Sequence, residues 1–81
     1  MWERPEVVAA VAQSMTAIGR NLRAIRKRKG LSQEQIAERA GLHAKHVQRL
    51  EAGAKNTTVA SIAALAAALE VRITRLFAGV E

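Results

Sequence analysis

Residues 33–52 read QEQIAERAGLHAKHVQRLEA, and this stretch decides the fold of the 81-residue chain. Apolar residues recur at helical spacing on both sides of a single glycine, Gly41. They are Ile36, Ala37, Ala40, Leu42, Val47 and Leu50. Since residues three or four apart share one face of a helix, the pattern predicts two short amphipathic helices joined by a sharp turn.

Local capping signals set the boundaries of these two helices. Ser32 followed by Gln35 has the spacing of a capping box, which predicts that the first helix covers residues 33–40. Gly41 suits the left-handed turn that ends this helix, and the second helix is expected over residues 44–52. Two short helices joined by three or four residues that include glycine have the layout of a helix-turn-helix.

Further helices are expected on either side of this pair. Thr58 is suited to cap a helix over residues 59–69, and a short helix over residues 73–77 follows. Aromatic residues make up only 2% of the chain, and strand-forming residues are scattered, which argues against a β-sheet. The sequence therefore predicts an all-α fold of five helices in one domain, residues 16–81.

Residues 1–15 are expected to be an N-terminal extension with some helix. Larger apolar residues continue at helical steps through Val7, Val11, Met15, Ile18, Leu22 and Ile25. Pro5 suits the first helical position. However, Gly19 interrupts the pattern and Thr16 is a suitable cap, so two arrangements remain open. One is a single long helix, and the other is a short helix followed by a second over about residues 16–29.

The charge of the chain points to a polyanionic partner. Thirteen Lys and Arg residues against seven acids give a net charge of +6, which favours nucleic acid first and an anionic membrane second. The absence of cysteine excludes disulfides, thiolate zinc sites and cysteine nucleophiles. The longest apolar run, residues 62–69, is far shorter than the ~20 residues that span a bilayer, and no signal peptide is evident. We therefore expect a cytoplasmic protein without a membrane partner.

The helix over residues 44–52, here called the recognition helix, has an apolar inward face and a cationic outward face. Lys and Arg reach guanine acceptors in the major groove of DNA, and Gln pairs with adenine. The first residues of such a helix meet base edges first. We therefore predict that Lys45 and Arg49 read bases, with Gln48 next and Ala44 as a thymine-methyl contact; a merely solvated face is the alternative.

Phosphate contacts are expected from residues that flank the recognition helix. Gln33 offers a side-chain donor at a helix N-terminus, and His43, Lys55 and Asn56 lie on either side of residues 44–52. For Asn56, a hydrogen bond within its own loop is equally open.

Two charged residues fall on inward faces. Arg26 lies four residues after Leu22, and Glu51 lies four residues after Val47. Two opposite charges on buried faces most simply satisfy each other, so we predict a structural salt bridge between Arg26 and Glu51.

The residues suited to metal binding do not form a complete set. His43 and His46 are three apart, but no Cys, Asp or suitably placed Glu accompanies them. We expect no metal, no cofactor and no small-molecule ligand. We do not expect an enzyme either, because each Ser is better explained as a loop, cap or helix residue than as a catalytic nucleophile.

With these residues, the chain resembles the phage-repressor-like (lambda-repressor-like, Xre-type) helix-turn-helix domains. The resemblance rests on Ile18-Gly19, Leu22-Arg23, Ile25-Arg26, residues 29–33, Ile36-Ala37, residues 40–42, Val47, residues 50–53 and residues 65–69. It implies a five-helix DNA-binding domain over about residues 16–77, whose third helix enters the major groove, and the same salt bridge. The chain looks most like the small stand-alone members, which include controller proteins of restriction–modification operons.

Three positions depart from the pattern of that family. Glu70 stands where the family usually has Gly, Thr57 replaces a frequent Pro, and Ala54 replaces a frequent cation. The geometry of the turn at Glu70 is therefore open.

Several apolar residues of the chain lie outside the expected core. The core is predicted to contain Ile18, Leu22, Ile25, Leu31, Ile36, Ala37, Ala40, Val47, Leu50, Val59, Ile62, Leu65, Ala66 and Leu69. Leftover apolar surface indicates an interface. The predicted dimer interface consists of Val71, Ile73, Leu76 and Phe77, with Val7, Val8 and Val11 as additional candidates.

We therefore expect a sequence-specific transcriptional regulator that binds double-stranded DNA as a homodimer. Each recognition helix would meet one half of a roughly palindromic operator. The alternative is a helix-turn-helix module that binds protein, such as an antitoxin-like or adaptor subunit. An apolar outer face on the recognition helix would favour that alternative, and Lys45 and Arg49 weigh against it.

Overall fold

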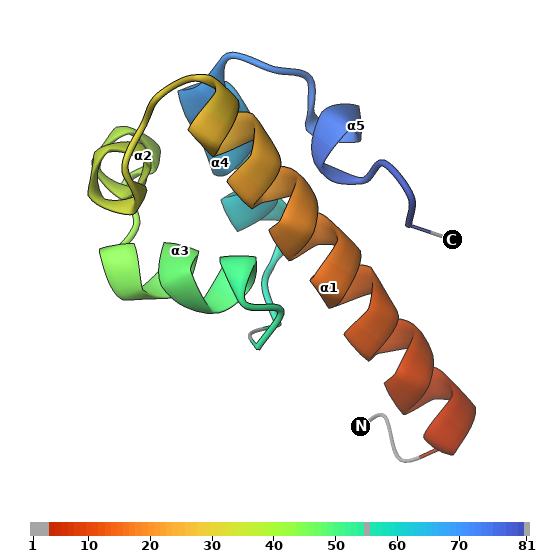
Figure 1. The fold of residues 1–81 in the computed structure, drawn as a ribbon. Helices are drawn as coiled ribbons and strands as arrows, with labels where there is room; N and C mark the ends of the chain where they lie inside the picture. Colours follow the sequence, from red (N-terminus) through yellow and green to blue (C-terminus); the bar gives the residue numbers. More distant parts are fainter. Residues whose placement is uncertain (1–3, 55, 81) are drawn as a thin grey trace.

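The computed structural model describes residues 4–54 and 56–80, and within these ranges it contains five helices and no strand. They are α1 (Pro5–Arg28), α2 (Gln33–Ala40), α3 (Ala44–Glu51), α4 (Val59–Leu69) and α5 (Ile73–Leu76) (Figure 1). The all-α prediction is confirmed, and α3 and α5 each end one residue earlier than expected, which is ordinary variation at helix ends. In the described ranges, no helix is both long and apolar enough to cross a membrane.

The first helix is continuous over 24 residues and begins with Pro5 in its first turn. Thr16 does not cap a second helix, because its hydroxyl donates to the Ala12 carbonyl at 2.9 Å inside α1. At about 1.5 Å per residue, α1 is about 36 Å long, and it sets the 38 Å long axis of the molecule. Buried residues of α1 begin only at Ala17, and the preceding turns project past the other helices (Figure 1).

The predicted caps of α2 and α4 are confirmed. The Ser32 hydroxyl accepts from the Gln35 amide at 3.0 Å, and the Gln35 side chain accepts from the Ser32 amide at 2.8 Å. Gly41 ends α2 with a φ of 73°, as a left-handed turn requires. The Thr58 hydroxyl accepts from the Ser61 amide at 3.1 Å at the start of α4. These local signals fix where the short helices begin and end.

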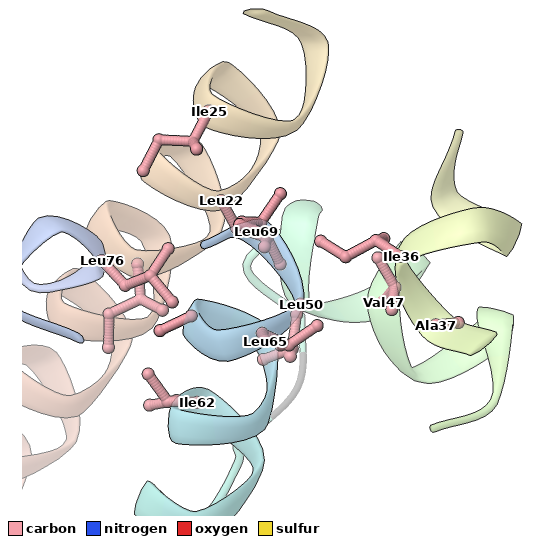
Figure 2. Packing of buried hydrophobic residues seen from close by; sticks show 12 residues of the cluster. Leu22, Ile25, Ile36, Ala37, Val47, Leu50, Ile62, Leu65, Leu69 and Leu76 are labelled. Carbon is pink, nitrogen blue, oxygen red and sulfur yellow. The ribbon is translucent and has the colours of Figure 1, made fainter. Parts of the chain in front are cut away.

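The core lies where α1, α2, α3 and α4 meet around Leu22, Leu50 and Leu65 (Figure 2). Most of the predicted core residues are buried, and Leu31 and Ala40 pack against the cluster while half-buried. Val59 was predicted to be in the core, and this is wrong, since it is 69% exposed. The prediction failed because nearly every position of α4 is alanine or another apolar residue. In such a helix, the sequence pattern does not distinguish the buried face from the exposed one.

The last helix packs onto the body more fully than the sequence indicates. Leu76 is only 1% exposed within the single chain, so its side chain belongs to the core of one copy, and its part in a dimer interface stays a prediction. Asn21 of α1 holds this segment, because its side-chain amide donates to the carbonyls of Leu76 at 2.9 Å and Ala78 at 2.6 Å. The other three residues of the predicted interface, Val71, Ile73 and Phe77, are half-buried against the core.

Glu70 ends α4 in the left-handed conformation, with a φ of 57°. Its amide donates to the Ala67 carbonyl at 3.1 Å, and the Val71 amide donates to the Ala66 carbonyl at 3.0 Å. The turn that glycine would make is therefore formed by a residue with a side chain. The left-handed conformation costs a non-glycine residue about 1–2 kcal/mol.

Candidate nucleic-acid interface

The orientation of α3 is fixed by its packing against α2. Ile36 and Ala37 on α2 and Val47 on α3 are each at most 2% exposed. The turn between the helices is closed by the Leu42 amide, which donates to the Ala37 carbonyl at 2.9 Å. Because these contacts bury one face of α3, the opposite face of this helix points to solvent.

The solvent-facing side of α3 carries the residues predicted to read bases. Lys45, Gln48 and Arg49 are exposed, and Ala44 is half-buried because it packs against the core. Within residues 4–54 and 56–80, the ion pairs are Arg4–Glu6 and Arg26–Glu51, so neither cation of this face is neutralised by an acid. The arrangement presents two cations and an amide, all hydrogen-bond donors, along one side of an exposed helix.

Arg26 and Glu51 form the predicted buried salt bridge between α1 and the end of α3. The Arg26 Nε atom lies 2.6 Å from Glu51 Oε2, and Nη2 lies 2.9 Å from Oε1, so the pair is bidentate. The two side chains are 10% and 3% exposed. Arg26 Nη1 also donates to the Leu31 carbonyl at 2.8 Å. The bonds to Glu51 raise the pKa of the Arg26 guanidinium above its ordinary value, although burial acts in the opposite direction.

Gln33 belongs to the same network, which sequence reasoning missed. Its side-chain amide donates to Glu51 Oε1 at 3.1 Å and thereby joins the first residue of α2 to the last residue of α3. Only the folded arrangement brings these two residues together, and no spacing in the sequence indicates the contact. The salt bridge therefore also positions Gln33, which is half-buried at the helix N-terminus.

The other flanking residues lie at both ends of α3. His43 is the exposed N-cap residue of α3, and Asn56 is exposed beyond its C-terminal end. Lys55, also predicted to contact phosphate, lies outside the described residues. His46 Nε2 lies 3.3 Å from the Thr57 hydroxyl, which ties α3 to the loop before α4. Across the described ranges, no three His, Cys, Asp or Glu residues are grouped as metal ligands would be.

Comparison with known proteins places this arrangement among regulators. Residues 22–76 match the helix-turn-helix family, and this range contains α2 to α5 and the C-terminal part of α1. The chain is 39% identical over 54 residues to the uncharacterized HTH-type transcriptional regulator y4dJ of Sinorhizobium fredii, covering 67% of this chain and 70% of that protein. It is 36% identical over 59 residues to the control protein C.SmaI of Serratia marcescens, covering 73% and 70%.

Solved structures with the same fold are named as the same kinds of protein, a controller protein and a transcription factor. The restriction–modification controller protein C.AhdI from Aeromonas hydrophila matches with a TM-score of 0.76 and 38% identity, over 78% of this chain and 96% of that one. A hypothetical transcription factor from Neisseria, NHTF, matches with a TM-score of 0.76 and 33% identity, over 79% and 74%.

Proposed function

Because the chain belongs to the helix-turn-helix family of DNA-binding transcriptional regulators, we propose that it binds a specific operator with α3 in the major groove of duplex DNA. The observation that carries the proposal is the exposed face of α3, on which Lys45, Gln48 and Arg49 stand without acidic partners in the described residues. Side chains that donate hydrogen bonds match the acceptors that guanine and adenine present in the major groove.

Within this proposal, Lys45 and Arg49 are the main base-reading residues. Each is exposed on α3, and the rigid attachment of α3 to α2 fixes the direction in which these long side chains extend. Gln48 contributes a second donor and acceptor pair. Ala44 is half-buried, which leaves part of its methyl group for contact with a thymine methyl.

Gln33, His43, Lys55 and Asn56 are proposed to contact phosphates on either side of the groove. Gln33 lies at the N-terminus of α2, where backbone amides favour an anion, and its side-chain amide has a second N–H besides the one that it donates to Glu51. His43 and Asn56 are supported by their exposure near the two ends of α3. Contacts of this kind fix the position of a protein on DNA without reading its sequence.

We further propose that two copies bind a roughly palindromic operator with half-sites about one helical turn apart. The similarity to C.SmaI and C.AhdI supports a role as a controller of a restriction–modification operon. An isolated domain of this size reads only a few base pairs, and pairing two domains multiplies its discrimination between sites.

Selection of bound DNA from a random duplex pool tests this function. The expected result is an enriched motif of two inverted half-sites with a fixed spacing. A pool that shows no preferred base after selection would overturn the proposal, since the exposed face of α3 would then bind DNA without reading it.

A further inference from the structure

The helices α3 and α5 lie on opposite sides of α1 (Figure 1). At Gly19, α1 meets the Leu50 carbonyl of α3 so closely that no Cβ atom fits between them. At Asn21, α1 instead holds the C-terminal segment through the carbonyls of Leu76 and Ala78. Positions two apart on a helix are about 200° apart around its axis. The surface beside α5 therefore stays accessible when the exposed face of α3 lies on DNA.

An open groove follows the line where α1 meets the C-terminal segment. It consists of two neighbouring hollows of about 180 and 360 Å³, with α1 on one side and residues of the segment 75–79 on the other. Arg28 and Arg75 line the first hollow, and Arg20 lines the second. We call this groove the α1–α5 seam. Most of its other lining residues are small, namely Ala12, Ala17, Ala24, Ala78 and Gly79.

The positive charge of the α1–α5 seam has no internal partner in the described part of the chain. Arg20, Arg28 and Arg75 are exposed, and within residues 4–54 and 56–80 their side chains make no ion pair and no hydrogen bond. The acids in these ranges lie elsewhere, in the two ion pairs described above, on α2 and at the end of α4. Glu3 and Glu81 lie outside the described residues. The seam thus presents three cations around a recess.

We propose that the α1–α5 seam binds an acidic peptide segment of another protein, whose carboxylates pair with the three arginines. A guanidinium matches a carboxylate with two parallel hydrogen bonds, which a lysine cannot do. Arg20 and Arg28 are eight residues apart, or about 12 Å along α1. A segment with several acidic residues spans this distance, and the small residues between the arginines let its backbone come close.

A nucleic acid fits the α1–α5 seam less well than a peptide does. Proteins that bind single strands stack bases on aromatic side chains, and no aromatic side chain lines either hollow. A rigid duplex cannot enter a hollow of about 180 Å³, whereas the carboxylate of an acidic side chain can. Duplex binding at this surface would rest on the tips of the arginines alone.

The position of the α1–α5 seam gives the contact a consequence for regulation. Because the seam and α3 lie on opposite sides of α1, one copy of the chain can hold a duplex and an acidic partner at the same time (Figure 1). The protein would then bring that partner to the DNA that it binds. This inference goes beyond the proposed function, and it does not depend on which bases α3 reads.

Fluorescence anisotropy of a labelled acidic peptide tests the proposal with two matched double variants. The probe alternates Glu and Ala over about 12 residues, which at ~3.3 Å per extended residue is longer than the seam. The seam variant is Arg28→Gln, Arg75→Gln. The control, Arg23→Gln, Arg72→Gln, also removes one exposed arginine from α1 and one from the start of α5, but neither residue lines the seam.

Both double variants carry the same net charge, so they differ only in where the charge is lost. Their positions are exposed and Gln is a good helix former, so both should fold, which circular dichroism checks. We expect the seam variant to weaken peptide binding at least about fivefold and the control variant less than about twofold. Equal losses in the two variants would mean that the peptide responds to net charge alone, and the proposal would be wrong.

Three further measurements exclude other sites and other partners. Lys45→Ala, Arg49→Ala should keep peptide binding within about twofold, and a loss as large as that of the seam variant would place the peptide on α3. Glu81→Gln should also stay within about twofold, since a rise of more than about fivefold would mean that the chain's own terminus fills the seam. A random-sequence duplex should lose equal affinity in both double variants, and a loss confined to the seam variant would make nucleic acid the ligand. Each contrary result overturns the proposal.

DNA selection separates this inference from the proposed function. If the selection enriches no motif while the seam variant alone loses the peptide, the proposed function is wrong and the inference stands. If the selection returns an operator while the two double variants bind the peptide equally, the inference is wrong and the proposed function remains.

Discussion

The backbone of α1 touches the backbone of α3 where Gly19 faces the carbonyl of Leu50. A Cβ atom at position 19 would lie 2.0 Å from the Leu50 oxygen, far inside van der Waals contact. Gly19→Ala should therefore destabilise the fold by about 2 kcal/mol or more, although Ala is the better helix former. Chemical denaturation followed by circular dichroism measures this loss.

A matched glycine separates the clash from backbone strain. Gly30 has a φ of 69° and nothing within 4 Å of an added Cβ, so Gly30→Ala should cost only about 1–2 kcal/mol. A Gly19→Ala variant that is more stable than the wild type would show that the close crossing of α1 and α3 is not maintained in solution.

The buried pair of Arg26 and Glu51 should be sensitive to the loss of either partner. Arg26→Met leaves the Glu51 carboxylate, which is 3% exposed, without its main counter-charge, so a loss of about 3–5 kcal/mol is expected. The double variant Arg26→Met, Glu51→Met should recover much of this loss. Denaturation of the wild type, Arg26→Met, Glu51→Met and the double variant gives the coupling energy.

The exposed pair of Arg4 and Glu6 supplies the control for this prediction. Its side chains are 81% and 64% exposed, so Arg4→Met should have no measurable effect on stability. The pKa of Arg26 is higher in the folded state than in the unfolded state, so the stabilisation from its charge is complete below the unfolded-state pKa. This stabilisation is lost only as the pH rises past the folded-state pKa, in strong alkali. A loss of the Arg26–Glu51 coupling on moving from about pH 6 to 9 would contradict this assignment.

Replacing Glu70 with glycine should stabilise the protein. The residue occupies the left-handed conformation, which glycine adopts without the Cβ penalty, although glycine gains more freedom when the chain unfolds. The expected gain is about 0.5–1 kcal/mol, seen as a rise in melting temperature. Glu38→Gly, in the interior of α2, should instead lower it. A destabilised Glu70→Gly variant would mean that the Glu70 side chain makes a contact that outweighs the strain.

Asn21 should control the docking of α5. Its side chain holds two carbonyls of the C-terminal segment, so Asn21→Ala should cost about 1–2 kcal/mol. Hydrogen exchange should quicken for the Val80 amide, which donates to the Phe77 carbonyl. Arg23→Ala, at an exposed position on the same helix, should leave exchange unchanged. Equal exchange in the two variants would show that α5 is held by apolar packing alone.

Features encoded by neighbouring residues could be predicted from the sequence. Ser32 and Gln35 form their capping box, Gly41 ends α2, and Thr58 caps α4, because each signal depends only on residues within one turn. The salt bridge of Arg26 and Glu51 was also predictable, since two opposite charges on buried faces have few other solutions. These features position the outward face of α3.

Features that depend on packing between distant segments could not be predicted. Gly19 looks like a helix break in the sequence, yet it lies inside α1 because α3 crosses there. Leu76 looks like surplus apolar surface, yet its side chain is buried in the core, and its carbonyl accepts from Asn21 of the distant helix α1. The bond between Gln33 and Glu51 joins residues 18 positions apart and has no local signal.

The central claim is that the exposed face of α3 reads bases. Its most direct test is the affinity of each variant for the selected operator and for a shuffled duplex, measured by fluorescence anisotropy over a range of salt. Lys45→Ala and Arg49→Ala should each lower the ratio of the two affinities by roughly 5- to 150-fold, equivalent to about 1–3 kcal/mol. Arg20→Ala removes the same charge from the exposed side of α1 and should leave the ratio unchanged. If all three variants weaken binding to both duplexes equally, α3 does not read the operator.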